Sequence, residues 1–205
     1  MLQTNAQKSF GVKVGYNNSD GKYQPNDIIH KSISGIQFGG FGQVNLNKFL
    51  LLQSNLLFTQ KGNYGDNSST SVDYYERTTF RMSFIELDAS IAFQTKIAEN
   101  TKINFGFGPY LGLGLFGKDK GMVYNFGNTG TIKRRIKFSN TYAGYEFSTF
   151  DPFDFGLNFN ASLAHKKYLF YLNFSNGINS RVPYNGMNRT SKNQVLSIGA
   201  GYYIK

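Results

Sequence analysis

The sequence predicts an all-β protein, an eight-stranded antiparallel up-and-down transmembrane β-barrel. Two observations lead to this fold class. Over segments of about ten residues, every second side chain is large and apolar, and long and short polar connections alternate between these segments. The first observation gives strands with two unlike faces, because side chains on a strand point alternately to opposite sides. The second gives the order in which the strands follow one another around the barrel.

The clearest alternation runs from Phe155 to Ser175. Large apolar side chains occupy every second position there, and mostly small or polar residues stand between them. A soluble barrel with a packed core has the same period, so alternation alone does not tell which face is inside. The polar face carries few long Lys and Glu side chains, which suits a narrow and crowded interior. We therefore expect the apolar face to point outward into lipid.

The composition supports this class and excludes others. Gly (23 residues), Phe (20) and Tyr (14) are abundant and charged residues make up only 17%, which fits a barrel with aromatic girdles. No apolar run approaches the ~18 residues of a membrane helix, whereas a barrel strand needs only ~9–11 residues, half of them apolar. Because the chain has no cysteine, disulfides and thiolate metal sites are excluded.

The first four strands each begin where apolar alternation starts and end at turn residues. In the first, Phe10, Val12 and Val14 share the outward face; in the fourth, Ile85 and Leu87 do. The predicted ranges are Phe10–Asn17, Ser34–Leu46, Phe49–Gly62 and Phe80–Lys96.

The last four strands follow the same rule. In the fifth, Ile103, Phe105 and Phe107 alternate with Asn and Gly, and in the eighth Leu196 and Ile198 alternate mainly with small residues. The predicted ranges are Lys102–Phe116, Phe153–Ala164, Tyr168–Ile178 and Gln194–Ile204.

The connections are long, short, long, short, long, short, long. This rhythm is typical of outer-membrane barrels, which have long outer loops and tight periplasmic turns, and it places both termini at the periplasmic end. The third long connection is too long for a plain loop, and we expect a hairpin rising from the fifth and sixth strands. The long connections are Asn18–Ser32, Asn63–Thr79, Gly117–Pro152 and Asn179–Asn193; the short ones are Asn47–Lys48, Ala98–Thr101 and His165–Lys167.

Two domains are predicted: residues 1–9 as a leader or signal-peptide remnant, and residues 10–205 as the barrel. Thr4 and Ala6 stand as the small residues that precede a signal-peptide cleavage point, with Gln7 after it. A plain disordered leader is the alternative.

Six stretches of the chain carry a resemblance to a known family: Phe10 to Asn17, Leu51 to Gly62, Phe84 to Leu87, Gly108 to Gly112, Asp154 to Leu157 and Ile198 to Tyr202. With them the chain resembles the outer-membrane β-barrel domain family common in Bacteroidetes, which includes PorT-like proteins. The resemblance implies an eight-stranded barrel in the bacterial outer membrane, and by analogy an accessory subunit of a secretion or assembly complex. Such barrels usually end in an aromatic residue, whereas this chain ends Ile204-Lys205.

Four charged residues are predicted to face the lumen. The alternation places Lys13, Glu86, Asp88 and Asp154 on the inward side of their strands, with Lys13 and Glu86 as the expected pair. Eight strands leave room for side chains but not for a pore, and buried charges must be paired. We interpret the set as a structural polar network; a proton or ion path is the alternative.

A basic cluster in the third long connection is the predicted contact surface. The net charge of the chain is +10, and Arg and Lys bind phosphates and carboxylates. We expect contact with outer-membrane lipid and lipopolysaccharide, or with the acidic face of another outer-membrane protein; a merely solvated loop is the alternative. No nucleic-acid-binding module accompanies the cluster. Its residues are Lys118, Lys120, Lys133, Arg134, Arg135 and Lys137, with Arg181, Arg189 and Lys192 in the fourth long connection.

The predicted function is a non-enzymatic, integral outer-membrane protein with a structural, binding or accessory role. His30 and His165 fall on opposite sides of the membrane, so they share no metal or catalytic site, and His30 near Asp27 is only half of a dyad. Nucleophile-elbow, zinc-protease and phosphate-loop motifs are missing, and we expect no cofactor. An enzyme acting on lipid or peptide at the loop rim and a small pore are the alternatives.

Overall fold

The computed structural model describes residues 8–23, 29–66, 74–139, 141, 147–178, 180–184 and 187–204, and all structural statements concern these residues. No helix in this part of the chain is long and apolar enough to cross a membrane. The described residues form eleven strands: β1 (Lys8–Tyr23), β2 (Ile29–Asn45), β3 (Leu50–Asp66), β4 (Tyr74–Ala98), β5 (Thr101–Asn125), β6 (Asn128–Phe138), β7 (Phe147–Phe150), β8 (Phe153–His165), β9 (Tyr168–Gly177), β10 (Ser180–Tyr184) and β11 (Met187–Tyr203).

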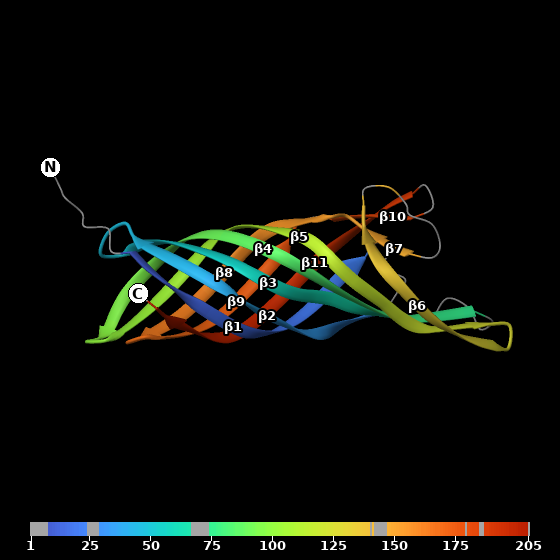
Figure 1. Cartoon of the computed structure of the whole chain (residues 1–205), viewed down its shortest axis with the longest axis horizontal. Helices are drawn as coiled ribbons and strands as arrows, with labels where there is room; N and C mark the ends of the chain where they lie inside the picture. The colour runs from blue at the N-terminus through green and yellow to red at the C-terminus, as the bar shows by residue number, and fades with distance from the viewer. Residues whose placement is uncertain are drawn as a thin grey trace.

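Eight of these strands close into a ring. The order is β4-β3-β2-β1-β11-β9-β8-β5, and pairing of β4 with β5 closes it. Every neighbouring pair in the ring is antiparallel. The result is the long, tilted barrel of Figure 1, with both ends of the chain at one end and β6, β7 and β10 at the other. The predicted eight-stranded antiparallel barrel is confirmed.

The predicted outward face is the exposed one. In β9, buried and exposed side chains alternate without exception, and Phe105 and Phe107 on β5 are more than half exposed. Aromatic rings gather toward both ends of this apolar surface: Phe38, Phe58 and Phe116 form one chain of contacts, and Tyr168 meets Tyr202 at the other end. An apolar belt with aromatic girdles is the lipid-facing surface of a transmembrane barrel.

The inside of the barrel is polar and filled. Most of its buried side chains are Asn, Ser, Gln and Thr. Where the large Tyr171 side chain lies along the inner wall, glycines make room for it: Gly15 and Gly199 face each other across β1 and β11, and a Cβ on either would collide with Tyr171. The Tyr171 hydroxyl accepts a hydrogen bond from Gln37 Nε2 (2.8 Å) on β2, next to Gly15 in the same row of paired residues.

The strands run further outward than predicted, so the long loops are wrong in extent. The predicted loop of residues 63–79 is strand up to Asp66 and again from Tyr74, and β10 and the start of β11 occupy much of residues 179–193. Beyond the membrane both faces of a strand meet water or loops, so backbone pairing continues without apolar alternation. The three short turns are confirmed at residues 46–49, 99–100 and 166–167.

The predicted hairpin in the third long connection is confirmed. β5 does not end at Phe116 but continues to Asn125, and β6 returns antiparallel to it. β7 then pairs with β6 in parallel at Arg135–Phe138. In Figure 1 this hairpin reaches furthest from the end that holds the termini.

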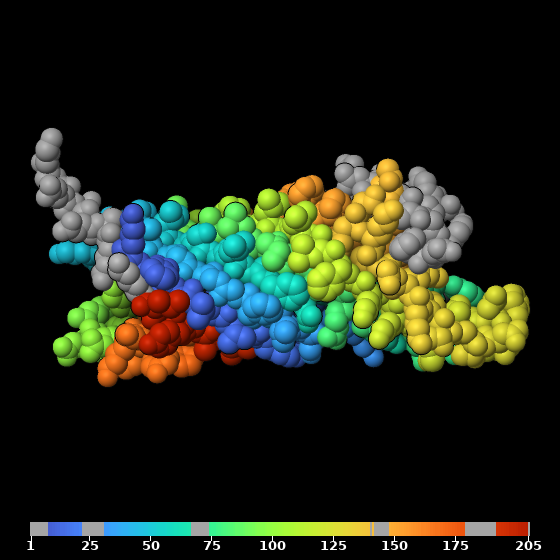
Figure 2. Space-filling view, in the orientation of Figure 1, coloured from blue at the N-terminus to red at the C-terminus, as the bar shows by residue number. Residues whose placement is uncertain are grey.

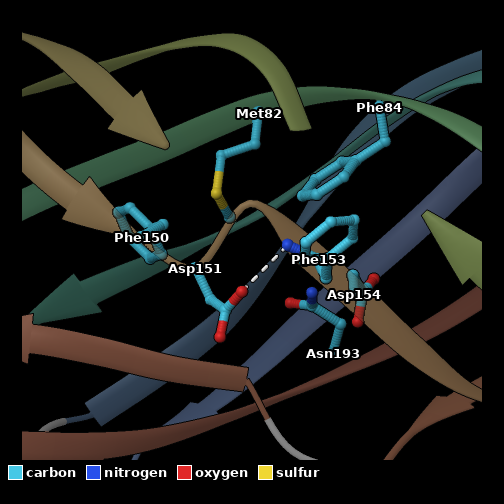
Figure 3. A pocket seen from close by; sticks show the side chains of 7 residues that line it. All are labelled: Met82, Phe84, Phe150, Asp151, Phe153, Asp154 and Asn193. Atoms are coloured by element: carbon cyan, nitrogen blue, oxygen red, sulfur yellow. Dashed lines mark hydrogen bonds between the residues drawn. The ribbon is translucent and has the colours of Figure 1, made fainter. Parts of the chain in front are cut away.

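The outer mouth of the barrel is closed by apolar side chains. Met82, Phe84, Ile136 and Phe150 form a buried cluster against which Phe80 and Phe138 pack. Beneath it lies a hollow of about 10 Å³, room for about one water molecule. The residues that line this hollow come from β4, from the segment between Phe150 and β8, and from β11, so the hollow lies inside the ring (Figure 3). They are Met82, Phe84, Phe150, Asp151, Phe153, Asp154 and Asn193.

Candidate functional site

The structure places all four predicted lumen charges inside the barrel. Lys13 projects from β1, Glu86 and Asp88 from β4, and Asp154 from β8, and all four side chains are buried. They divide into two groups, because each carboxylate finds its partner on a different strand.

Lys61 on β3 is the centre of the first group, and sequence reasoning assigned it no role. Its Nζ lies 2.5 Å from Glu86 Oε2 and 2.9 Å from Asp154 Oδ2. The same Nζ lies 4.6 Å from the centre of the Tyr110 ring, and the Tyr110 hydroxyl donates to Asp154 Oδ1 (3.3 Å). Lys61 is the largest side chain of the barrel with almost no exposure, at 1%. The signal was present: Lys61 lies within the predicted third strand, Phe49–Gly62, two residues after Thr59, which is also buried.

The second group surrounds Asp88. Asn55 Nδ2 donates to Asp88 Oδ1 (2.6 Å), and Asn158 Nδ2 lies 3.4 Å from Asp88 Oδ2. The expected pairing of Lys13 with Glu86 is not formed, because Lys61 holds Glu86. Lys13 Nζ instead lies 4.6 Å above the Tyr171 ring. The lumen is therefore stabilised by charge-assisted hydrogen bonds that link β3, β4, β5 and β8, and by a cation–π contact between β1 and β9.

A bulge in the outer wall decides which way the basic cluster faces. The pairing of β4 with β5 shifts by one residue between Ser83 and Phe84. Up to Leu115 the odd-numbered side chains of β5 point outward, and beyond the bulge the even-numbered ones do. A one-residue shift exchanges the two faces of a strand. Lys118 and Lys120 consequently continue the outer surface on which Phe116 lies.

Cations stand directly opposite cations on this surface. Lys118 is flanked by Arg81 on β4 and by Arg135 on β6, and Lys120 is opposite Lys133. All five side chains are exposed, and Lys137 follows Arg135 on the same face. Directly opposed side chains lie ~5 Å apart, and like charges at that position destabilise a sheet. We call this surface the cation face; its residues are Arg81, Lys118, Lys120, Lys133, Arg135 and Lys137.

Asp66 is an acidic residue on the same surface, and its Oδ2 is 3.0 Å from Arg77 Nε. Arg81 was not part of the predicted cluster, because the bulge that aligns it with Lys118 leaves no mark in the alternation.

Arg134 does not belong to the cation face. Its side chain points to the opposite side of β6, and Nη1 lies 3.9 Å from Oδ2 of the buried Asp119. Ser148 on β7 donates to the same Asp119 oxygen (2.7 Å). Burial raises the pKa of Asp119, and the Ser148 hydrogen bond and Arg134 offset only part of this. Arg134 thus helps to fasten β6 and β7 to β5.

The remaining predicted residues lie elsewhere. Lys192 is exposed on β11, and His165 sits at a short turn, where its Nδ1 lies 2.9 Å from Thr101 Oγ1. Asp27 and the side chains of His30, Arg181 and Arg189 fall outside the described residues. Within the described ranges no group of three or more His, Cys, Asp or Glu residues could hold a metal.

Comparison with known families decides the class of protein. Residues 4–181 match the family described as "Outer membrane protein beta-barrel domain". The chain belongs to this family. It is an outer-membrane protein of bacteria, and because barrels of this kind have short periplasmic turns and longer extracellular loops, its cation face lies on the extracellular side.

Solved structures of other outer-membrane barrels are similar to this family member over nearly their whole length, at low identity. They include Ail, the attachment invasion locus protein of Yersinia pestis (15% identity, 97% of this chain and 99% of that chain, TM-score 0.41). Neisserial surface protein A follows with 11% identity, 96% and 98% coverage and a TM-score of 0.44. OprG from Pseudomonas aeruginosa has 10% identity, with 100% of this chain and 99% of that chain covered and a TM-score of 0.49. No curated protein matches the chain.

Proposed function

We propose that this protein is a non-enzymatic outer-membrane barrel whose cation face binds the phosphate groups of lipopolysaccharide. The observation that carries the proposal is the direct opposition of Arg81, Lys118 and Arg135 across three strands. Such a row repels itself when empty and is stabilised when an anion bridges its members. On a surface that contacts only water, interspersed acidic and basic residues would avoid this repulsion.

The height of the cation face above the membrane supports the same ligand. Phe116 belongs to the outer aromatic girdle through its contact with Phe58, and girdles mark the boundary between lipid and water. Lys118 follows on the same face after two residues, ~7 Å along the strand. Lipid phosphates lie at this boundary, within reach of long Lys and Arg side chains.

The filled lumen favours a structural role over the small pore. Lys61, Glu86 and Asp154 tie β3, β4 and β8 together across the interior, and the apolar cluster around Met82 and Phe150 covers the outer mouth. Removal of Lys61 would leave two carboxylates buried without their cation, so we assign this network to holding the barrel wall in register.

A second role is an accessory subunit of a larger outer-membrane secretion or assembly complex, as the resemblance to PorT-like proteins of Bacteroidetes implies. The projecting hairpin of β5 and β6 favours it, because this hairpin extends well beyond the level of the lipid phosphates.

The test of glycolipid binding removes charge from the cation face without touching the barrel. The triple variant Arg81→Gln, Lys118→Gln and Arg135→Gln is compared with Lys96→Gln, Lys166→Gln and Lys167→Gln, which lowers the charge equally at the periplasmic turns. Binding of purified lipopolysaccharide to the protein in zwitterionic micelles is measured by calorimetry. We expect the first variant to bind at least about tenfold more weakly, a difference of about 1.4 kcal/mol.

Two further results belong to this experiment. Enzymatic removal of the lipid A phosphates should reduce binding by the wild type as strongly as the triple variant does, and added salt should weaken the wild-type affinity. Equal affinities for the two triple variants would contradict the proposal.

A further inference from the structure

Phe126 at the tip of the β5–β6 hairpin occupies an unfavourable backbone conformation. The turn has two residues, Phe126 with φ of 42° and Gly127 with φ of 85°. Both values are positive, as in the type I′ turns that join two-residue hairpins. Asn, Asp or Gly normally fills the first position, because a bulky side chain is strained in the left-handed region. A turn selected for folding alone would read Asn-Gly here.

The Phe126 side chain is also unfavourably placed with respect to water. It is 74% exposed, the highest value among the large apolar side chains that the structure describes. The other strongly exposed Phe and Leu side chains mostly lie on the lipid-facing belt. Phe126 instead lies in the two-residue turn between β5 and β6, the hairpin that projects from the barrel in Figure 2. Strain and exposure at one residue indicate a function, because neither benefits the isolated fold.

The residues behind Phe126 form a rigid aromatic support. The rings of Tyr75 and Tyr124 stack with centres 5.1 Å apart, and Arg77 lies over the Tyr75 ring at 5.2 Å. Met122, two residues further back on β5, is exposed. Aromatic residues, Met and Arg are the types enriched in the cores of protein–protein interfaces.

The shape, height and charge of the tip together identify the class of partner. Binding sites for small molecules are concave, whereas Phe126 stands at a convex apex. It lies ten residues beyond Phe116, ~33 Å along the strand, and thus well past the lipid phosphates. Lys120 and Lys133 flank the hairpin below it, so a second copy of this chain would be repelled by the same charges.

We propose that Phe126 inserts into an apolar pocket, rimmed by Asp and Glu, on a different outer-membrane or surface protein. The stacked tyrosines hold the turn in position, Arg77 and the upper cations Lys120 and Lys133 meet the acidic rim, and the barrel anchors the hairpin in the membrane. This contact is independent of glycolipid binding by the membrane-proximal part of the cation face.

The experiment begins with a photo-crosslinking phenylalanine analogue at position 126 in cells of the native host. We expect one discrete protein adduct, which becomes weaker at high salt and is not formed when the analogue stands at position 99, in the exposed turn between β4 and β5 at the other end of the barrel. The captured protein is identified and purified, and its affinity for the wild-type barrel, Phe126→Asn and Glu99→Ala is measured.

The variant Phe126→Asn separates contact from folding. Asn suits the first position of this turn, so the thermal midpoint of the barrel should stay the same or rise, while affinity for the partner falls at least tenfold and lipopolysaccharide binding is unchanged. Glu99→Ala at the opposite end of the barrel should alter neither affinity. Adducts only with lipopolysaccharide, the absence of any adduct, or an unchanged affinity of Phe126→Asn for the purified partner would each overturn the proposal.

Discussion

The lumen and the cation face use the same side chains in opposite ways. In the lumen Lys61 is buried, and two carboxylates meet its ammonium group within 3 Å. On the cation face Lys118 is exposed and stands between two arginines. A buried charge without a partner is costly, so the interior must contain complementary charges. An exposed charge is screened by water, so evolution can leave it unmatched where a ligand will supply the opposite charge.

Asp119 and Arg134 form an intermediate case. The carboxylate is buried, yet its guanidinium partner is more than one-third exposed and 3.9 Å away. They lie on the reverse side of the same β5–β6 sheet, so one hairpin carries a closing contact on one face and unmatched cations on the other. Substitutions at Lys61, Asp119 and Lys118 therefore test whether the degree of burial decides if a charge stabilises the fold or is left available to a ligand.

The largest effect is expected from Lys61→Met. The substitution leaves Glu86 and Asp154 buried without their cation, which should lower the free energy of unfolding by about 3–5 kcal/mol. Urea-induced unfolding in lipid bilayers, followed by heat-modifiable gel migration, measures the loss.

A combined variant provides the control. In Lys61→Met with Glu86→Gln and Asp154→Asn, the buried charges disappear together, and most of the lost stability should return because no group is left ionised and unpaired. If the single variant is as stable as the wild type, the lumen network has no structural role and the contrast with the cation face fails.

The sequence predicted the membrane-spanning part of the barrel well because lipid imposes a strict pattern there. Period two alone placed Lys13, Glu86, Asp88 and Asp154 on the inward side. It did not reveal that Lys61 binds Glu86, because alternation tells which face a side chain occupies and not which strands lie across the lumen. Partners across a barrel depend on its closure and stagger, which no local pattern records.

Outside the membrane the sequence was a weaker guide. The sequence predicted a hairpin in the third long connection but ended the fifth strand at Phe116, since water on both sides of a strand removes the apolar alternation. The bulge near Phe116 also exchanges the inner and outer faces of β5 beyond it. For this reason Arg81, which was not predicted, lies on the cation face, whereas Arg134, which was predicted, points to the opposite side. A bulge is one extra residue on one of two paired strands. The sequence of one strand does not show which residue is the extra one, because this depends on how the neighbouring strand pairs with it.

A smaller, pH-dependent effect is expected at Asp119. Burial is the main cause that raises the pKa of its carboxyl in the folded protein. The folded state therefore binds the proton more tightly than the opened state, and this contribution to stability is present below the ordinary pKa of about 4 and lost as pH rises through the folded value. Packing of β6 and β7 against β5 should loosen from about pH 4 upward.

Amide exchange protection in β6, measured between pH 4 and 8, checks this effect. Asp119→Asn should keep the hydrogen bond to Ser148 and flatten the pH dependence, whereas Asp66→Asn on the exposed face serves as the matched control. The same pH dependence in Asp119→Asn and in the wild type would assign the change to another group.

The smallest effect, and the sharpest contrast with the lumen, is expected from Lys118→Gln. In zwitterionic detergent the substitution removes the central charge between Arg81 and Arg135, so the barrel should become more stable by about 0.2–1 kcal/mol. Salt at 1 M, where the screening length is ~3 Å, should remove this gain. With lipopolysaccharide present the sign should reverse, because the wild type gains stability from the bound ligand and Lys118→Gln gains less. The thermal midpoints of the wild type and of Lys118→Gln, measured in zwitterionic detergent, at 1 M salt and with lipopolysaccharide, test these three expectations. A substitution that destabilises under all of them would show that Lys118 supports the sheet itself, and the cation face would then belong with the lumen as a structural element.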